Sequence, residues 1–551
     1  MSQTERAIIL LHFLPKLSIF FHVRSYLLKG FPKGAGSSKH LGAEPVCAAA
    51  ERKLQGRFIP ADPMRFCRGD DGFGRSVRSS EQAPIVCLKQ NFTVNHIVMN
   101  NKSLNMAEGP ILPLLLQMSW PSIATVLVVN VYYLIDAFWL ARLSSNALAA
   151  LTISLPIQVI LGGVGVGTGL GAGSYAARMF GAEENRKARQ TAGQVFFLSA
   201  VLGALFISLG MAGPDLILTY FGATTEILPL SRRYLLTLLP GVPFLFLIMM
   251  ASNLFRAEGR PHLVMYCALM TSAVSGILDP MLIFGWGPFP RLGIEGAAMA
   301  AVISQISGAA LAFYFLRQKS SKYQLKWHYL RPDYRIILSI YSTGFPSMII
   351  NLVLSLGMLL HNHVLGGYSN LAVATLGIVS RMSGLVMIPL YGIGHGLMPM
   401  VAFSEGANLP VRLMEAVAIA VKISFAIAMV CFLIVEAFAP AIATLFSDDM
   451  ELRRLTATAL RINFLILITA APSLMWINMF IGLGQGKAAM VLLVGREILF
   501  LIPFLWLLPS WFGINGVWMA QPLANAIAFL FILYWAKRQY RMFDSLIHEK
   551  T

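Results

Sequence analysis

Charged residues are scarce in this chain: Asp, Glu, Lys and Arg make up 13% of its 551 residues, while 56% are hydrophobic. Soluble domains carry about 25% charged residues, so the composition excludes a soluble fold. The apolar residues form runs of about 20, which matches the ~30 Å hydrocarbon core of a bilayer. Because backbone groups cannot hydrogen-bond to water there, continuous apolar runs favour helices over a barrel. We therefore expect an all-α membrane protein.

Cysteine is also scarce, with five residues and no CxxC or Cys/His spacing. This excludes a disulfide framework and a typical zinc site. Cys267 and Cys431 fall inside apolar runs, where a lone cysteine is usually a packing residue. The glycine-rich segments lack the Lys-Ser/Thr of a phosphate loop, and small residues at their spacing allow close helix packing. We expect no enzymatic activity, no cofactor and no bound metal.

Basic residues dominate the charge, which is +17, and their positions predict the topology. Twelve membrane spans are predicted at approximately 112–140, 147–177, 190–212, 228–255, 262–285, 296–317, 334–363, 371–402, 412–438, 454–481, 488–509 and 514–536. The connections on one side carry eighteen Lys and Arg residues, and those on the other side carry six. The positive-inside rule places the first side and the C-terminus in the cytoplasm of a multi-pass plasma-membrane protein. The basic residues then face anionic lipid, and no nucleic-acid partner is expected.

A pattern of about 220 residues occurs twice. The matching pairs are Pro121-Ser122 with Pro346-Ser347, 165–170 with 392–397, Gly181-Ala182 with Gly406-Ala407, Glu258-Gly259-Arg260 with Gln485-Gly486-Lys487, and 293–296 with 513–516. Six spans in each copy mean that both copies enter the membrane from the same side. The pattern predicts two parallel six-helix repeats, an arrangement that often works by rocking one lobe against the other.

The repeat divides the chain into an N-lobe at 106–320, a cytoplasmic linker at 321–333, a C-lobe at 334–540 and a cytoplasmic tail at 541–551. Residues 1–105 have no repeat partner and are rich in basic residues, Gly, Ser and Pro. They are predicted to be a disordered or non-native extension without a part in function. A targeting or regulatory arm is the alternative.

Two acids interrupt the apolar spans of the N-lobe. Asp136 follows Tyr132 by four residues, so both side chains share one helix face. Asp279 precedes Pro280, which removes a backbone donor and opens the helix there. A carboxylate at membrane depth is costly and marks a functional site by default. Two in one lobe suit a site that binds and releases a proton, or that shares a sodium ion; a structural place at the helix ends is the alternative.

The C-lobe has no acid at the matching position. The repeat offset from Asp136 leads to His361, which is either a titrating group near neutral pH or an interfacial residue at a helix end. Arg381 lies within the eighth span without an obvious partner, and His395 has no assigned role. Adjacent Arg496 and Glu497 are expected to form a local ion pair.

From about 106 to 540 the chain resembles a multidrug and toxic compound extrusion (MATE) transporter of the bacterial type. The resemblance is carried by Pro121 with Asp136, the segment 255–259, Leu278-Asp279-Pro280, the segment 293–298, the segment 392–399 followed by Gly406-Ala407, and Gln485-Gly486. It implies a monomer that exports small organic, often cationic, compounds in exchange for a cation by alternating access. It also implies that Tyr132, Asp136 and Asp279 line the cation site, with Asn253 and Ser275 as further polar ligands.

Departures from the family pattern affect the expected ion. Ser275 replaces a frequent Asn, Ala301 replaces a frequent Thr, and the seventh span lacks an acid. Fewer oxygens favour protons over sodium as the coupling ion, with both left open. The alternative function is a lipid-linked oligosaccharide flippase of the same superfamily. That function needs a strongly cationic cavity, and apart from Arg381 and Arg496 the spans contain few midspan cations.

Overall fold

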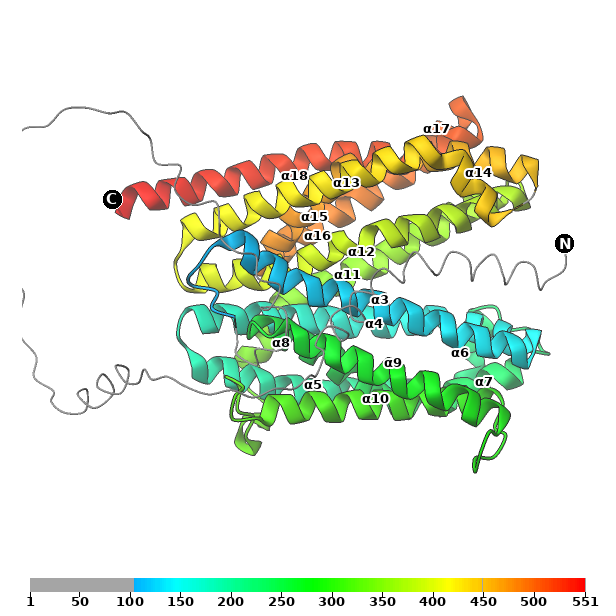
Figure 1. Cartoon of the computed structure of the whole chain (residues 1–551), viewed down its shortest axis with the longest axis horizontal. Helices are drawn as coiled ribbons and strands as arrows, with labels where there is room; N and C mark the ends of the chain where they lie inside the picture. Colours follow the sequence, from blue (N-terminus) through cyan, green and yellow to red (C-terminus); the bar gives the residue numbers. More distant parts are fainter. Residues whose placement is uncertain (1–103, 448, 551) are drawn as a thin grey trace, which may run out of the picture. The chain divides into compact units, whose positions relative to one another are not determined.

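The computed structural model describes residues 104–447 and 449–550, and within these all regular structure is helical (Figure 1). The first half contains α3 (Ile111–Leu143), α4 (Ser145–Gly181), α5 (Asn185–Ala212), α6 (Pro214–Tyr220), α7 (Leu228–Leu238), η3 (Leu239–Gly241), α8 (Val242–Ala257), α9 (Pro261–Phe284), α10 (Ile294–Arg317) and η4 (Trp327–Leu330). The second half contains α11 (Tyr334–Gly366), α12 (Asn370–Gly406), α13 (Pro410–Phe446), α14 (Met450–Phe464), α15 (Ile466–Gly482), α16 (Gly486–Gly495), η5 (Arg496–Leu501), α17 (Ile502–Phe512) and α18 (Ile514–Lys550). The predicted extension at 1–105 lies outside the described residues except for its last two.

The membrane spans agree with the prediction from the sequence. In the described part of the chain, eleven helices are long and apolar enough to cross a membrane, or twelve if α14 and α15 form one span bent by 41°. The predicted fourth span is continuous over Leu228–Ala257, because η3 joins α7 to α8. The all-α membrane fold is therefore confirmed. Helix α18 continues through the predicted tail at 541–551 as far as Lys550.

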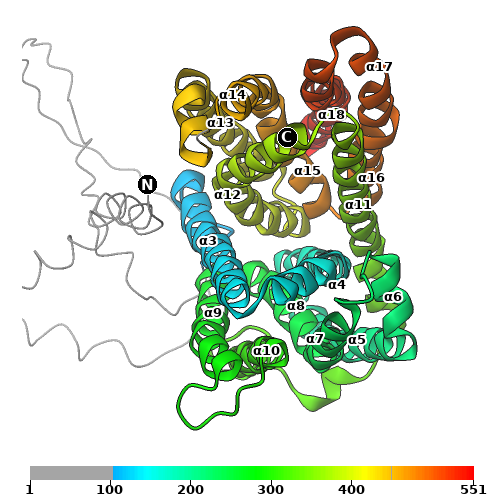
Figure 2. The ribbon, with the colours of Figure 1, turned by 90° about the vertical axis from the view of Figure 1, so that its right-hand side faces the viewer.

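Helices α3 and α11 connect the two halves. α3 packs against α9 of its own half and α12 of the other half, and α11 packs against α16 and α4 in the corresponding way. Figure 2, which looks along the helices, shows α3 and α11 at the boundary between the two groups. We call the end that carries the α4–α5, α8–α9 and α12–α13 turns the inner end; it is the end predicted to face the cytoplasm.

Equivalent glycines make equivalent contacts in the two halves. A Cβ atom at Gly169 on α4 would lie 2.7 Å from Nδ2 of Asn253 on α8. A Cβ atom at Gly394 on α12 would lie 2.7 Å from Nδ2 of Asn478 on α15. Both distances are shorter than real Cβ contacts, so the asparagine side chain would have to shift to admit a Cβ atom at either crossing. The two crossings correspond at an offset of 225 residues, which pairs Gly169 with Gly394, whereas the sequence match of 165–170 with 392–397 pairs Gly169 with Gly396.

The starts of α10 and α18 also correspond. Gly293 precedes α10 with φ 60° and ψ −129°, and Gly513 precedes α18 with φ 57° and ψ −140°. Glycine adopts this region without the steric cost that a Cβ atom brings. The repeated Gly-Ile motif is therefore required by the sharp turn into each lobe's last long helix.

The inner ends of α4 and α12 are in direct backbone contact. A Cβ atom at Gly181 would lie 2.8 Å from the backbone nitrogen of Ala407, and its nearest atom would be the carbonyl oxygen of Phe403. A Cβ atom at Gly406 would lie 2.9 Å from Cα of Arg178. The two glycines belong to the same repeated motif, so the two copies of the motif meet each other. The lobes are closed against one another at the inner end.

Hydrogen bonds between the lobes add to this closure. Ser174 Oγ on α4 donates to the carbonyl of Ile481 at 2.8 Å, and Arg178 Nη1 donates to the carbonyl of Gly482 at 3.0 Å. Arg412 at the start of α13 donates from Nε to the carbonyl of Met106 at 2.8 Å. Both lobes therefore hold the partner lobe's backbone through side-chain donors.

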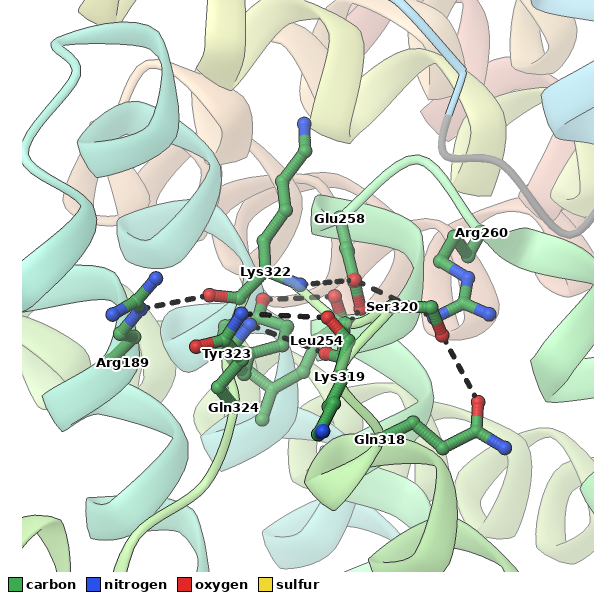
Figure 3. Close-up of polar contacts among 11 residues, drawn as sticks. Arg189, Leu254, Glu258, Arg260, Gln318, Lys319, Ser320, Lys322, Tyr323 and Gln324 are labelled. Atoms are coloured by element: carbon green, nitrogen blue, oxygen red, sulfur yellow. Dashed lines mark hydrogen bonds and ion pairs between the residues drawn. The ribbon is translucent and has the colours of Figure 1, made fainter.

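The segment predicted as the linker is hydrogen-bonded to the N-lobe (Figure 3). The Lys322 backbone N–H donates to Glu258 Oε1 at 2.7 Å, and the Tyr323 hydroxyl donates to the carbonyl of Leu254 at 2.9 Å. Arg189 Nε on α5 donates to the carbonyl of Lys322 at 3.0 Å. Glu258 and Tyr323 are both completely buried. Burial raises the pKa of the Glu258 carboxyl, while the Lys322 N–H and Arg260 oppose that shift.

Candidate cation site in the N-lobe

The two predicted acids lie together between α3 and α9. Asp136 is 8% exposed and Asp279 is 1% exposed, so neither carboxyl faces open solvent. The two groups are close enough to interact electrostatically. The packing of α3 against α9 brings them together, beside an apolar cluster that includes Leu140 and Ile283. The structure thus places both acids in one buried site, which sequence separation alone does not reveal.

Asp279 has one oxygen available. Ser275 Oγ, one helical turn earlier on α9, donates to Asp279 Oδ1 at 3.5 Å. Asp279 Oδ2 is buried and has no hydrogen-bond partner among the described residues. A buried polar atom without a partner is rare and needs an explanation, such as a bound ion or a proton. This oxygen is therefore free to carry a proton or to bind a cation.

Two tyrosines complete the site. Tyr132 on α3 is half-buried, lies beside Ser275, and interacts with both carboxyls. Tyr234 on α7 is 3% exposed, also interacts with both carboxyls, and lies beside Gln158 of α4. Sequence reasoning missed Tyr234 and Gln158. Neither lies in a repeated motif, and they come to the site through the packing of α7 against α4 and of α4 against α3.

The arrangement offers oxygen ligands alone. Carboxylates, phenol hydroxyls and a serine hydroxyl suit a proton or a hard cation such as sodium. No Lys or Arg interacts with Asp136 or Asp279 in the described residues. No group of three or more His, Cys, Asp or Glu residues that could hold a metal ion occurs in the described ranges. A monovalent cation can therefore bind at the two carboxyls without displacing a Lys or Arg side chain.

Asn253, a predicted ligand, lies elsewhere. It is four residues before the end of α8, whereas Asp279 is eighteen residues after the start of the next helix. At 1.5 Å per residue the two differ in depth by roughly 20 Å. Asn253 packs against Gly169 and Gly173 of α4 and accepts a hydrogen bond from Arg256. Its environment is that of a residue that holds two helices together.

His361, the repeat counterpart of Asp136, is buried on α11. Its ring centroid lies 6.3 Å from that of Trp518 on α18, and its Nε2 atom has no partner among the described residues. It is 4% exposed, so its side chain is packed inside the protein. Arg381 is exposed on α12 and forms no hydrogen bond or ion pair within the described part of the chain. The structure does not bring these two residues to the carboxyl pair.

The C-lobe does bury a carboxyl, at a position that the repeat does not predict. Glu497 is 3% exposed and forms an ion pair with Arg496, as expected from the sequence. Arg496 Nη1 also donates to Asn525 Oδ1 on α18 at 3.1 Å. The segment that carries both residues is π-helical. Unlike Asp136 and Asp279, this carboxyl already has a cationic partner.

A family model described as MatE matches the chain twice, at residues 121–281 and at residues 346–507. The chain belongs to the MatE family. The matched ranges begin at the two prolines of the repeat and include both carboxyls of the N-lobe site. The family membership that the motifs suggested is confirmed.

Relatives of this MatE-family chain cover most of its length. Multidrug export protein MepA of Staphylococcus aureus (strain MSSA476) is 25% identical over 431 residues, which is 78% of this chain and 94% of the relative. The protein of the same name from Staphylococcus saprophyticus is 24% identical over 424 residues, or 76% and 93% of the two chains.

Solved structures show the same fold. One is described as the outward-facing conformation of a multidrug resistance MATE family transporter of the MOP superfamily; it has a TM-score of 0.75 and 24% identity and covers 81% of this chain and 99% of its own. Another, described as MATE in the bent conformation, has a TM-score of 0.76 and 24% identity and covers 80% and 98%.

Proposed function

We propose that this chain is a plasma-membrane antiporter that exports organic compounds, many of them cationic, in exchange for protons or sodium. The observation that carries the proposal is the buried carboxyl pair of Asp136 and Asp279, with one oxygen of Asp279 unpaired. The names of the relatives, which are multidrug export proteins, support the substrate class. The family match supports a transport function.

The coupling step uses alternating access between two arrangements of the lobes. The cation binds at Asp136, Asp279, Tyr132, Ser275 and Tyr234 and neutralises the buried charge. A site of this kind changes its packing with occupancy, because an uncompensated carboxylate at membrane depth is costly. The inner contacts of α4 with α12 must open in the other arrangement. The cytoplasmic location of the inner end and of the C-terminus belongs to this proposal.

The proposal is tested by efflux of a fluorescent organic cation from proteoliposomes, under an imposed pH gradient and then under a sodium gradient. Asp136→Asn keeps the size of the side chain and removes its ionisable proton. We expect it to lower gradient-driven efflux at least about tenfold, the size of effect that follows from losing about 1.4 kcal/mol of coupling. Asp279→Asn is expected to have the same effect.

A matched control distinguishes the loss of the cation site from a general effect of removing one negative charge. Asp544 is exposed near the end of α18, so Asp544→Asn makes the same change outside the site and is expected to leave efflux unaltered. Gradient-driven efflux at the wild-type rate in Asp136→Asn would refute the proposal. Efflux driven by the pH gradient alone identifies the proton as the ion, and efflux driven by the sodium gradient alone identifies sodium.

A further inference from the structure

Arg256 is a buried cation at the boundary between the lobes. It is the second-last residue of α8 and is 6% exposed. Its Nε atom donates to Ser122 Oγ at 3.4 Å, and its Nη1 atom donates to Asn253 Oδ1 at 3.4 Å. Both bonds are longer than the usual range for N–H donors.

No acid in the described residues forms an ion pair with Arg256. The nearest carboxylate in the sequence, Glu258, pairs with Arg260 instead. A buried charge in a membrane helix is normally paired or faces a water-filled cavity, because desolvation of an isolated charge is costly. A guanidinium carries five N–H donors, and within the described residues two of those of Arg256 are used. The group therefore has unused donors in a place where water is largely excluded.

Two further polar atoms without partners lie beside it. His395 of α12, in the other lobe, interacts electrostatically with Arg256, and its Nδ1 atom is buried without a partner in the described chain. The next residue, Gly396, packs on α3, where its Cβ position would lie 2.6 Å from Ser119 Oγ. Ser119 is 1% exposed, and its hydroxyl likewise lacks a partner among the described residues. Three helices from both lobes thus converge with polar groups, and no carboxylate of the described residues is paired with them.

We propose that Arg256, His395 and Ser119 form a binding site for a small monovalent anion, either chloride or a carboxylate group of a transported compound. Charge-assisted hydrogen bonds from a guanidinium and a hydroxyl are the strong interactions that recognise such an anion. The anion contacts α3 and α8 of one lobe and α12 of the other, so its binding favours the closed inner end. None of these residues belongs to the carboxyl site, so the inference stands whether or not the proposed coupling site is correct.

The test measures anion-dependent stability rather than transport. The purified full-length chain in detergent is unfolded by heat in potassium chloride, potassium formate or potassium isethionate, a larger anion without a carboxylate, at one ionic strength, with tryptophan fluorescence as the signal. A ligand that binds only the folded state raises the Tm as its concentration increases. We expect a saturable rise with chloride, with formate or with both, relative to isethionate. A rise with chloride alone identifies an inorganic anion, and a rise with formate extends the site to carboxylates.

Variants test whether the anion-dependent rise in Tm comes from binding at Arg256, His395 and Ser119. Arg256→Gln removes the cation and is expected to abolish the anion-dependent rise. Ser119→Ala removes one hydroxyl donor and is expected to weaken half-saturation by about tenfold, the effect of one hydrogen bond to a charged group. Arg454→Gln makes the same charge change at an exposed position on α14 and is expected to behave as wild type.

Two results would overturn the proposal. One is an equal Tm of the wild type in all three salts at every concentration. The other is an unaltered anion response in Arg256→Gln. If Arg256→Gln does not fold, Ser119→Ala decides, since a wild-type half-saturation in that variant also contradicts the site.

Discussion

The crossing of α4 and α12 at Gly181 controls how closely the lobes approach at the inner end. An alanine there places its Cβ 2.8 Å from the backbone nitrogen of Ala407 and closer still to the carbonyl of Phe403. Ordinary contact begins at 3.4 Å, so clearing the Ala407 nitrogen alone requires 0.6 Å, and clearing the nearer Phe403 oxygen requires more. Both obstacles are backbone atoms, which cannot rotate away as a side chain can.

The cost of that separation follows from overpacking, which is typically about 1–3 kcal/mol. Because each 1.4 kcal/mol is a factor of ten, the ratio of closed to open inner ends in Gly181→Ala should fall about 5- to 150-fold. Gly377→Ala on the same α12 is the control, since no atom lies within 4 Å of its Cβ position. That control should be neutral or slightly stabilising, because alanine favours a helix by about 1 kcal/mol over glycine.

The assay is a distance measurement across the lobes. Spin labels at Arg186→Cys on α5 and Val411→Cys on α13, both exposed, report the separation of the inner ends in a background without native cysteines. Gly181→Ala should populate longer distances, and Gly377→Ala should match the parent. If Gly181→Ala gives the parent's distance distribution, the backbone contact does not limit the approach of the lobes and the reasoning is refuted.

Three further predictions concern the inner loops and the entry turns. Burial raises the pKa of the Glu258 carboxyl above the unfolded value of about 4.3. Because the folded state then binds this proton more tightly than the unfolded state, the free energy of unfolding falls as the pH rises from about 4.3 through the raised pKa. In Glu258→Gln this part of the pH dependence of Tm should be absent; its persistence would assign the fall to another group. Tyr323→Phe removes the buried bond to the Leu254 carbonyl and should cost about 1–3 kcal/mol in denaturant unfolding, whereas Tyr220→Phe, at 86% exposure, should cost nothing measurable. Gly293→Ala forces a side chain into the positive-φ turn before α10 and should destabilise by about 1–3 kcal/mol, while Gly276→Ala, inside α9 with open space, should not; equal stability of the two would show that the turn tolerates a Cβ atom.

The fold was accessible from the sequence because its signals are local. Apolar runs of span length, the repeated glycines and the basic connections each act within a few turns of helix. The repeat identified Gly406 as the counterpart of Gly181. The sequence did not show that these two glycines would lie in contact. The extent of α18 was missed, because its polar final turns carry no membrane signal while remaining helical.

The candidate site was accessible only in part. Asp136 and Asp279 stand out as charges in apolar helices, but their proximity depends on how α3 packs against α9. Tyr234 could not be selected, since a tyrosine near a helix end is common and its depth depends on the α7–α8 junction. Asn253 was selected by analogy, and its place near the inner end follows from its position four residues before the end of α8.

The attachment of the linker has a consequence for how the chain is made. The bonds that hold Lys322 and Tyr323 all go to residues that precede them, in α5 and around the α8–α9 turn. Leu104 likewise bonds to Gly259, within the first half. The linker can therefore pack on α5 and on the α8–α9 turn as soon as it is synthesised, before α11 is made, which shortens the time for which its polar backbone is exposed. Contacts that need both halves, such as the bond from Arg412 to Met106, can form only after the second half is made.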